Sequence, residues 1–335
     1  MTTRPDGTPA SERDGPHDRD VVVVGGGAAG LSAAVFLGRY GLDTLVLARG
    51  KSAIHQCAHL ENYLGFPAGI SPERFVAIGR AQVEHEGATV EEDLVEAVEP
   101  HDPGFAVETQ DGRSLVTEYL LVASAYDGDY LSSFDADLET DDEHGFLVTE
   151  GGRTSVDGLY AAGWLTRDTV HQAVVNAGDG GRAAVSLARD DLTDRYWPEI
   201  GEIYVDWVVD DDRYGGENWH EDVDDWFDRE IRPGAPDLDE ETLEEVRDEM
   251  KGAFLDRGID DAERRRRERE GQRFLLEHLD DDVVREYARS LETCEDTSAG
   301  SGAADGLRES TGCEESGDTD RPTAATDADD GGSDR

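Results

Sequence analysis

A valine-rich stretch that runs into three spaced glycines constrains this chain most. Residues 21–47 read VVVVGGGAAGLSAAVFLGRYGLDTLVL, so β-branched residues lead directly into Gly25, Gly27 and Gly30. The first glycine suits a tight turn off a strand, the second a close backbone approach, and the third close packing of a helix on a sheet. An apolar helix ending at Gly41 and a second apolar strand follow. The stretch therefore predicts a βαβ unit whose helix amides face a dinucleotide pyrophosphate.

Charge is the second constraint on this chain. It carries 79 acidic and 31 basic residues, for a net charge of −48, and its lysines are Lys51 and Lys251 alone. The excess is spread along the sequence, so it repels nucleic acid and anionic membrane surfaces. A carboxylate-rich, lysine-poor composition resembles that of proteins from salt-accumulating archaea, in which multimolar salt screens self-repulsion. We expect a halophilic, cytoplasmic protein without nucleic-acid or membrane partners.

Export signals and metal-site spacings are missing from the sequence. No apolar run is long enough to span a bilayer, and residues 1–20 contain no apolar signal core. The cysteines, which lack the spacing of a disulfide framework or a zinc site, are Cys57, Cys294 and Cys313. The histidines considered as metal ligands, and rejected on their spacing, are His55, His59 and His171. No metal is expected.

Periodicity and composition divide the chain into four parts. Residues 1–18 and 293–335 are polar and lack apolar periodicity, which predicts a disordered arm and a disordered acidic tail. Residues 19–192 alternate apolar strands with helical patterns and predict an α/β domain, Rossmann-like and three-layered. Residues 193–292 are acidic with scattered aromatic anchors and predict an added, mostly helical region.

Local signals place the elements within these parts. Strands are expected at 21–24, 44–48, 88–91, 105–109, 114–117, 119–123 and 159–162, and helices at 29–40, 72–86 and about 170–189. Ser71 and Pro72 have the character of a helix cap and first helical residue. Asp111-Gly112 is typical of a hairpin turn.

Two further helices are expected in the acidic region. One begins after Asp239 and ends near Gly258, and the other runs through an arginine block to about Leu291. The block, Arg264–Arg267, has the charge to bind an anion. Because glutamates flank it within a helix, it is better interpreted as a salt-bridged, solvated helix face.

Three segments in a fixed order carry a family resemblance. They are VVVVGGGAAGLSAAVFLGRYG (21–41), HLENYLGFPAGISPERFVAIGRAQVEHEGATV (59–90) and SVDGLYAAGWLTRDTVHQAVVNAGDGGRAAVSLARDDL (155–192). Together, residues 19–192 resemble the FAD-binding domain of thioredoxin reductases, the low-molecular-weight class of flavin disulfide reductases. The resemblance implies that the dinucleotide is FAD.

The resemblance also implies positions for the cofactor contacts. In that family the glycine turn holds the pyrophosphate, the E-N-x-x-G-F-P loop lines the cofactor, and the A-A-G segment leads to a helix whose amino end faces the flavin. The corresponding residues here are Gly25, Gly27, Ala29 and Gly30 at the pyrophosphate, Gln56 and Asn62 along the cofactor, and Gly163, His171, Gln172 and Ala173 toward the flavin. A positive helix end beside the ring favours the anionic reduced flavin.

The chain departs from this family in three ways. Residues 126–156 stand where the family has a second, NAD(P)H-binding domain, and they are too few for one. The redox Cys-x-x-Cys of that domain is missing, and the glycines at 178–180 follow no strand. Trp164 replaces the aspartate that binds the ribityl chain in the family, which predicts weaker binding of FAD.

Two residues near the expected cofactor remain ambiguous. Arg49 stands at the end of the second strand, where dinucleotide-binding folds place an acidic residue, so it suits either the 2′-phosphate of an NADP cofactor or a turn beside the FAD pyrophosphate. The family resemblance favours FAD. Cys57 is the candidate catalytic residue, because a single thiolate forms a mixed disulfide or a sulfenic acid. The alternative is a small buried residue in the cofactor loop.

Three functions follow from these patterns. The first is an FAD-binding oxidoreductase, not itself a thioredoxin reductase, that receives electrons from diffusible NAD(P)H or from a protein partner. The second is a non-catalytic FAD-binding regulatory or redox-sensing protein. The third, a nicotinamide-dependent dehydrogenase, is disfavoured by the flavin-type closing segment at 155–192. A protein redox partner or a homodimer is expected as the assembly, with residues 193–292 as a cover or partner surface.

Overall fold

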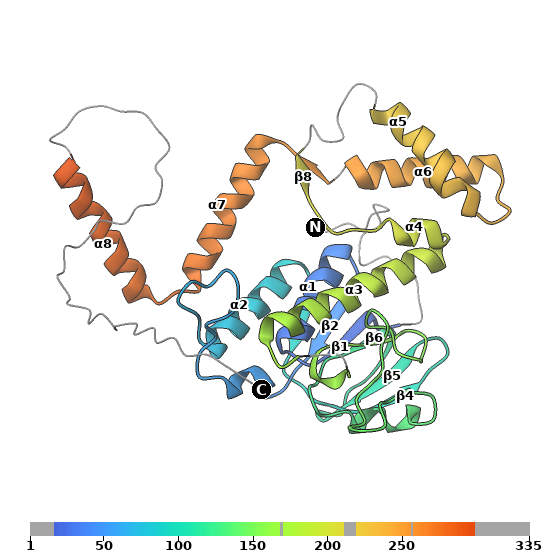
Figure 1. Cartoon of the computed structure of the whole chain (residues 1–335), viewed down its shortest axis with the longest axis horizontal. Helices are drawn as coiled ribbons and strands as arrows, with labels where there is room; N and C mark the ends of the chain where they lie inside the picture. The colour runs from blue at the N-terminus through green and yellow to red at the C-terminus, as the bar shows by residue number, and fades with distance from the viewer. Residues whose placement is uncertain (1–16, 168–169, 211–218, 256, 299–335) are drawn as a thin grey trace, which may run out of the picture. The chain divides into compact units, whose positions relative to one another are not determined.

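The computed structural model describes residues 17–167, 170–210, 219–255 and 257–298 (Figure 1). Their contacts form two compact units, which divide between His278 and Leu279. The second unit contains one described helix, α8 (Asp281–Ser298). Among the helices described in either unit, none is long and apolar enough to cross a membrane.

A mixed sheet lies at the centre of the first unit. Its strands are β1 (Arg19–Val24), β2 (Thr44–Leu47), β3 (Thr89–Glu91), β4 (Val95–Pro100), β5 (Phe105–Thr109), β6 (Ser114–Val122) and β7 (Leu159–Ala161). They run in the order β3-β2-β1-β6-β5-β4, and β7 pairs with β6. Strands β3, β2, β1, β6 and β7 are parallel, whereas β4 and β5 are antiparallel. The parallel strands bring their carboxyl ends to one edge, where open α/β sheets bind ligands.

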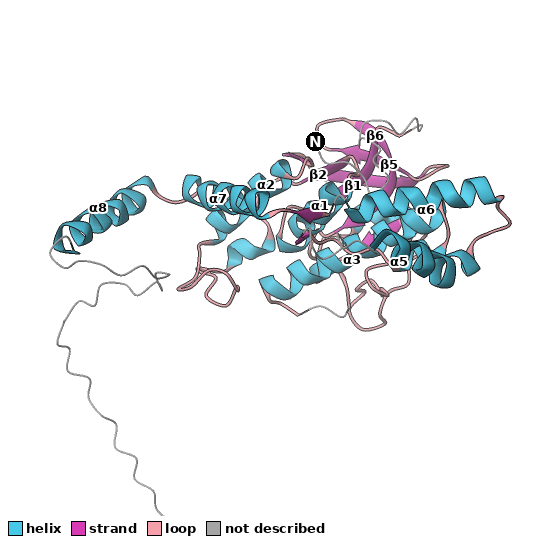
Figure 2. Ribbon diagram, turned by 90° about the horizontal axis from the view of Figure 1, so that it is seen from above, coloured by secondary structure: helices cyan, strands magenta, loops and turns pink. Residues whose placement is uncertain are grey.

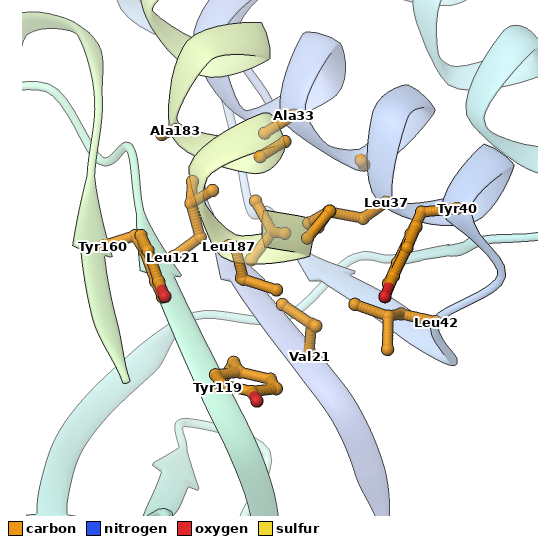
Figure 3. Close-up of a cluster of buried hydrophobic side chains, with 14 of the residues drawn as sticks. Val21, Ala33, Leu37, Tyr40, Leu42, Tyr119, Leu121, Tyr160, Ala183 and Leu187 are labelled. Carbon is orange, nitrogen blue, oxygen red and sulfur yellow. The ribbon is translucent and has the colours of Figure 1, made fainter. Parts of the chain in front are cut away.

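Three helices cover one face of this sheet: α1 (Ala28–Tyr40), α2 (Pro72–His85) and α3 (Ala173–Arg195). Figure 2 shows the strands β1, β2, β5 and β6 beside one another, with α1 and α3 next to them. Leu37 of α1 and Leu187 of α3 meet Val21 and Leu121 in a core from which water is fully excluded (Figure 3). Truncating one such leucine to alanine costs about 2–5 kcal/mol of stability.

The opposite face of the sheet is covered by a smaller layer. Val22 and Leu120 point into it, where they are fully buried with Phe134 and Leu147. Phe134 ends the short helix η2 (Asp129–Phe134), which also contacts β4. The sheet is therefore enclosed on both sides. The expected α/β, Rossmann-like class with added helices is confirmed.

Three local features expected from the sequence are present in the structure: the end of α1, the cap of α2 and the turn between β5 and β6. Helix α1 ends at Gly41, which adopts the left-handed conformation at φ 94° that favours glycine. Ser71 caps α2 by accepting a hydrogen bond from the Arg74 amide at 3.3 Å, and Pro72 is the first helical residue. Gly112 lies in the turn between β5 and β6, as expected.

The strands around this unit differ from the expectation in two places. The separate strands expected at 114–117 and 119–123 form one strand, β6. Glu118 is partly exposed between the buried Thr117 and Tyr119, so its charge fits the alternation of the strand and does not interrupt it. Strand β4 has no counterpart among the expected elements. Only Val95 and Val98 are buried in it, since its glutamates face solvent.

Two expected helices also have different bounds. The closing helix, expected over about 170–189, begins at Ala173 and continues to Arg195. It continues because Asp191 is buried and accepts a hydrogen bond from the Tyr40 hydroxyl at 2.6 Å. The helix expected to run through the arginine block to about 291 is broken into α7 (Asp261–Glu277) and α8. The carboxylates of Asp281 and Asp282 lie in the first turn of α8, where they suit a new helix start.

Several elements follow α3 within the first unit: α4 (Pro198–Glu202), β8 (Val209–Asp210), α5 (Trp219–Trp226), the π-helical turn η5 (Phe227–Ile231), η6 (Arg232–Gly234), α6 (Glu240–Leu255), β9 (Gly258–Ile259) and α7. Trp197 is buried and donates its indole N–H to the Ile231 carbonyl at 3.0 Å. Arg39 of α1 holds both carboxylate oxygens of Asp206, at 2.7 and 2.9 Å. Part of the acidic region therefore packs on the helical face of the sheet.

Helix α7 confirms the interpretation of the arginine block. Arg266 binds Glu263 and Glu270 at 2.7 and 2.8 Å, and Arg267 binds Glu263 at 2.7 Å. These partners lie three or four residues away on the same helix, where opposite charges face each other across one turn. The block is a paired, solvated helix face.

Candidate functional site

A cleft of about 740 Å³ opens at the carboxyl ends of the parallel strands. Its walls come from the turn after β1, the loop after β2, the ends of β6 and β7 and the first residues of α3. This volume is in the range of ordinary small-molecule and cofactor sites. The cleft is the candidate functional site.

The glycine turn forms the floor of this cleft. Gly25 lies at φ 113°, and a Cβ there would lie 2.5 Å from the Ala123 carbonyl oxygen. A Cβ on Gly30 would lie 1.9 Å from the Gly25 oxygen, so Gly30 lets α1 pack against the turn. Both glycines are therefore required by the fold itself.

Gly27 has a different role from its two neighbours. It is the N-cap of α1 and its φ of −89° is open to any residue. A Cβ there would meet only Ser52, at 3.5 Å, which is ordinary contact. Nothing in the protein's own packing demands a glycine here, so the space that it leaves in the cleft is space for a ligand. The first amides of α1 receive no side-chain cap from Gly27, which suits an anion.

Basic groups line the same end of the cleft. Arg80 of α2 and Lys51, in the loop after β2, both contribute to its wall. The Nε of Arg80 is buried without a hydrogen-bond partner. A buried unpartnered donor costs about 1–3 kcal/mol, which a phosphate oxygen would recover. Arg80 was not among the expected site residues, because an arginine in an amphipathic helix has no distinguishing local signal.

Arg49 lines the cleft as well, but its guanidinium is already bound. It donates to Gln110 at 2.6 Å and to Asp111 at 2.5 Å, and Asp93 lies 3.6 Å away. Burial opposes the ionisation of Asp93, yet hydrogen bonds from Thr109 and two backbone amides lower its pKa below the ordinary value. Arg49 thus ties the end of β2 to the loop before β4 and the β5–β6 turn. Its suggested contact with a phosphate stays a prediction.

The other end of the cleft is formed by the turn after β7 and the start of α3. Gly163 packs on Ala29, so that a Cβ would lie 3.0 Å from the Ala29 side chain. Asn176, on the first turn of α3, is buried and donates its amide to the Val170 and Gln172 carbonyls at 2.9 and 2.7 Å. Sequence reasoning missed Asn176. Its signal was a polar residue on the apolar face of the closing helix.

Three aromatic rings line the cleft beside this turn. The Trp164 and His171 rings lie 4.0 Å apart between centroids, inclined by 31°, and Tyr126 lies 5.2 Å from Trp164 and 6.1 Å from His171. Next to them, the Ser124 and Tyr130 hydroxyls lie 2.7 Å apart. Burial raises the pKa of Tyr130, so its phenol stays protonated and fixes the start of η2.

The structure gathers most of the expected site residues in one place. The residues that line the cleft are Gly25, Gly27, Ala29, Arg49, Gln56, Cys57, Gly163, His171 and Ala173. Gly30 lies beneath the turn. Asn62 and Gln172 are outside the lining residues and bind each other, with the Asn62 amide donating to Gln172 Oε1 at 2.7 Å. Their contacts with a cofactor stay predictions.

Cys57 lies exposed at the cleft wall, so the alternative of a small buried residue is wrong. Its neighbouring histidines are engaged with the backbone: His55 lies 3.1 Å from the Ser52 carbonyl, and His59 lies 3.1 Å from that of Ala68. In the described part of the chain, no group of three or more His, Cys, Asp or Glu side chains is placed to hold a metal ion. A redox role for Cys57 stays a prediction.

Comparisons with known proteins identify the type of domain that contains this cleft. The sequence profile of a family described as an FAD binding domain matches residues 20–59, which form β1, α1, β2 and η1 (Ala53–Gln56). A thioredoxin reductase of Aquifex aeolicus is 35% identical over 107 residues, which are 31% of this chain and 33% of that protein. A thioredoxin reductase of Chlamydia trachomatis is 29% identical over 175 residues, 52% of this chain and 51% of that protein. The chain carries a thioredoxin-reductase-like FAD-binding domain.

The solved structures agree on the fold of this FAD-binding domain. A thioredoxin reductase from Gloeobacter violaceus has a TM-score of 0.50 and 19% identity, over 58% of this chain and 100% of that one. At this identity the likeness concerns the fold alone. The curated relatives are matched over a third to a half of their own length.

Proposed function

We propose that the chain is an FAD-dependent oxidoreductase and that FAD occupies the cleft. One observation carries this proposal: the amino end of α1 and the amino end of α3 line the same cleft, with ligand space left at Gly27. Two helix starts that face one site suit a cofactor with a diphosphate and a ring that becomes anionic on reduction.

The residues present fit this cofactor. The α1 amides, with Arg80 and Lys51, would hold the pyrophosphate, and the start of α3 with Ala173 and Asn176 would lie toward the ring. Bound flavin supplies hydride and single-electron transfer. The protein's part is to orient that ring, exclude water from one side and leave the other side accessible to an electron donor.

The electron donor is diffusible NAD(P)H or a protein partner. Between β6 and β7 all residues are described, and this stretch holds η2 and turns rather than a second βαβ unit. Cys57 is the one cysteine whose side chain is described. We therefore propose that the chain does not reduce thioredoxin by itself with NADPH. Sustained NADPH-dependent thioredoxin turnover by the purified chain would refute this.

The alternative is an FAD-binding regulatory or redox-sensing protein. The short stretch between β6 and β7 favours this alternative, because it holds no second nucleotide-binding unit that could deliver electrons to the flavin. A flavin without such a unit also suits a protein that senses redox state. Anaerobic addition of NADH or NADPH tests the oxidoreductase that uses a diffusible donor. Bleaching of the flavin absorption on mixing supports that form of the oxidoreductase, whereas reduction by dithionite alone excludes NAD(P)H as the direct donor and leaves a protein donor or the regulatory role.

The cofactor assignment is tested by a matched pair of glycine variants. In multimolar potassium chloride, the wild type should bind FAD saturably and show flavin absorption. Gly27→Ala keeps ordinary contacts within the protein but fills the ligand space, so binding should fall at least tenfold. Gly178→Ala, whose Cβ meets nothing within 4 Å, is the control and should bind normally. Normal FAD binding by Gly27→Ala would show that the assignment is wrong.

A further inference from the structure

The ring end of the cleft is built from aromatic side chains. Tyr126 follows β6, Trp164 lies in the turn η3 (Gly163–Leu165) after β7, and His171 precedes α3. Three separate segments of the chain thus each bring one ring to the same wall. Their mutual distances of 4.0 to 6.1 Å are those of interacting aromatic pairs.

These rings are not covered by the protein's own core. The Tyr126 side chain is 58% exposed, His171 is exposed and Trp164 is half-buried. The backbone before Trp164 is closely packed, because a Cβ on Gly163 would lie 3.0 Å from the Ala29 side chain and 3.1 Å from Asn176 Oδ1. An anchored aromatic group that keeps an open surface inside a cleft is suited to a ligand.

The chemistry of Trp164 indicates what kind of ligand contact this is. An indole has one N–H donor and no acceptor, so Trp164 offers a bound ligand little hydrogen bonding. What it offers is a large π-face, on which planar rings stack with useful affinity and little demand on their hydrogen-bonding pattern.

We propose that Tyr126, Trp164 and His171 form a stacking site for the planar isoalloxazine ring of bound FAD. The cofactor is then held by two unlike contacts, a pyrophosphate on the α1 amides and a planar ring against aromatic side chains. This inference rests on the proposed function. It also predicts ligand specificity: the three rings increase the affinity for FAD and leave the affinity for a nucleotide diphosphate such as ADP unchanged.

The test compares FAD with ADP as ligands of the full chain in multimolar potassium chloride. Trp164→Leu and Trp164→Asp should weaken FAD binding about tenfold, and Trp164→Phe, which keeps a ring, by no more than about threefold. ADP binding should be unchanged in all three, which also shows that they are folded. Trp207→Leu, at a 47% exposed tryptophan outside the cleft lining, is the matched control and should change neither ligand.

Flavin emission gives a readout that does not depend on affinity. A stacked indole quenches the fluorescence of a flavin, so the bound FAD of Trp164→Leu and Trp164→Asp should be brighter than that of the wild type, and the Trp207→Leu complex should match the wild type. FAD binding by Trp164→Asp that equals or exceeds the wild type would overturn the stacking site and leave the proposed function standing. A wild type that binds ADP but not FAD would overturn both.

Discussion

Gly180 lies at the closest contact between α1 and α3 among the glycines of α3, and it yields a quantitative prediction. A Cβ on Gly180 would lie 2.0 Å from the carbonyl oxygen of Ala29, whereas ordinary contact begins at 3.4 Å. In Gly180→Ala the two helices must therefore move apart by about 1.4 Å. The obstacle is backbone, which cannot rotate away as a side chain can.

The magnitude follows from two opposing effects. Alanine favours a helix interior over glycine by about 1 kcal/mol. Overpacking of a close contact costs about 1–3 kcal/mol, and a backbone clash lies at the upper end. Gly180→Ala should therefore lose about 2 kcal/mol of unfolding free energy. Gly178→Ala, two residues earlier with open space, should gain about 1 kcal/mol from helix propensity alone.

Urea denaturation in multimolar potassium chloride, followed by tryptophan fluorescence, measures this difference. With an m value of about 1–3 kcal/mol/M, the two midpoints should differ by about 1 M or more. Because α1 and α3 frame the cleft, Gly180→Ala should also bind FAD more weakly than the wild type. A midpoint for Gly180→Ala equal to or above that of Gly178→Ala would refute the reasoning.

Three further predictions concern charge and backbone. Lowering the salt to about 0.01 M extends the range of charge repulsion to about 30 Å, so the melting temperature should fall steeply on dialysis to dilute buffer; an unchanged value would contradict the halophilic interpretation. Partial desolvation and the charges of Asp190 and Asp191 raise the pKa of Asp194, so its ionised form destabilises the fold above that pKa. Because the side chain is exposed, solvent screens this penalty to a small one, which disappears as the pH falls through the pKa. Asp194→Asn should therefore melt above the wild type near neutral pH and level with it in acid, and a gap that persisted in acid would rule this out. Ala125 lies at φ 63°, so Ala125→Gly should relieve about 1 kcal/mol of strain, but glycine adds about as much entropy to the unfolded chain; the urea midpoint should therefore stay close to that of the wild type, and a large shift either way would contradict this balance.

The sequence predicted those parts of the fold that depend on local chemistry. The β1-α1-β2 unit, its end at Gly41 and the cap of α2 at Ser71 all arise from residues within one turn or strand. The continuity of β6 could not be predicted in this way. Glu118 looks like a break along the chain, and only the pairing with β1, which includes both Thr117 and Tyr119, shows that one strand continues through it. On its other side β6 pairs with β5 up to Thr117 and with β7 from Leu120.

The same distinction between local and long-range chemistry applies to the candidate site. The glycine turn was predictable because the role of each glycine depends on the strand and helix that directly flank it. The partners of Arg49 could not be foreseen, because Asp93 and Asp111 come from later loops that only the folded sheet brings beside it. The cluster of Tyr126, Trp164 and His171 likewise joins segments from three places in the sequence, so the sequence singled out Trp164 alone and not the rings that lie beside it.

The pairing of Arg49 has a kinetic consequence. With its guanidinium held by carboxylates, the cleft of a chain with a net charge of −48 offers an incoming anionic nucleotide little long-range attraction. Such a nucleotide must first diffuse against a repulsive potential, and it meets the α1 amides, Lys51 and Arg80 only at close range. Added salt weakens the distant repulsion more than these short contacts. Association should therefore become faster as salt rises, which is the opposite of the behaviour of a nucleotide-binding protein with a basic entrance.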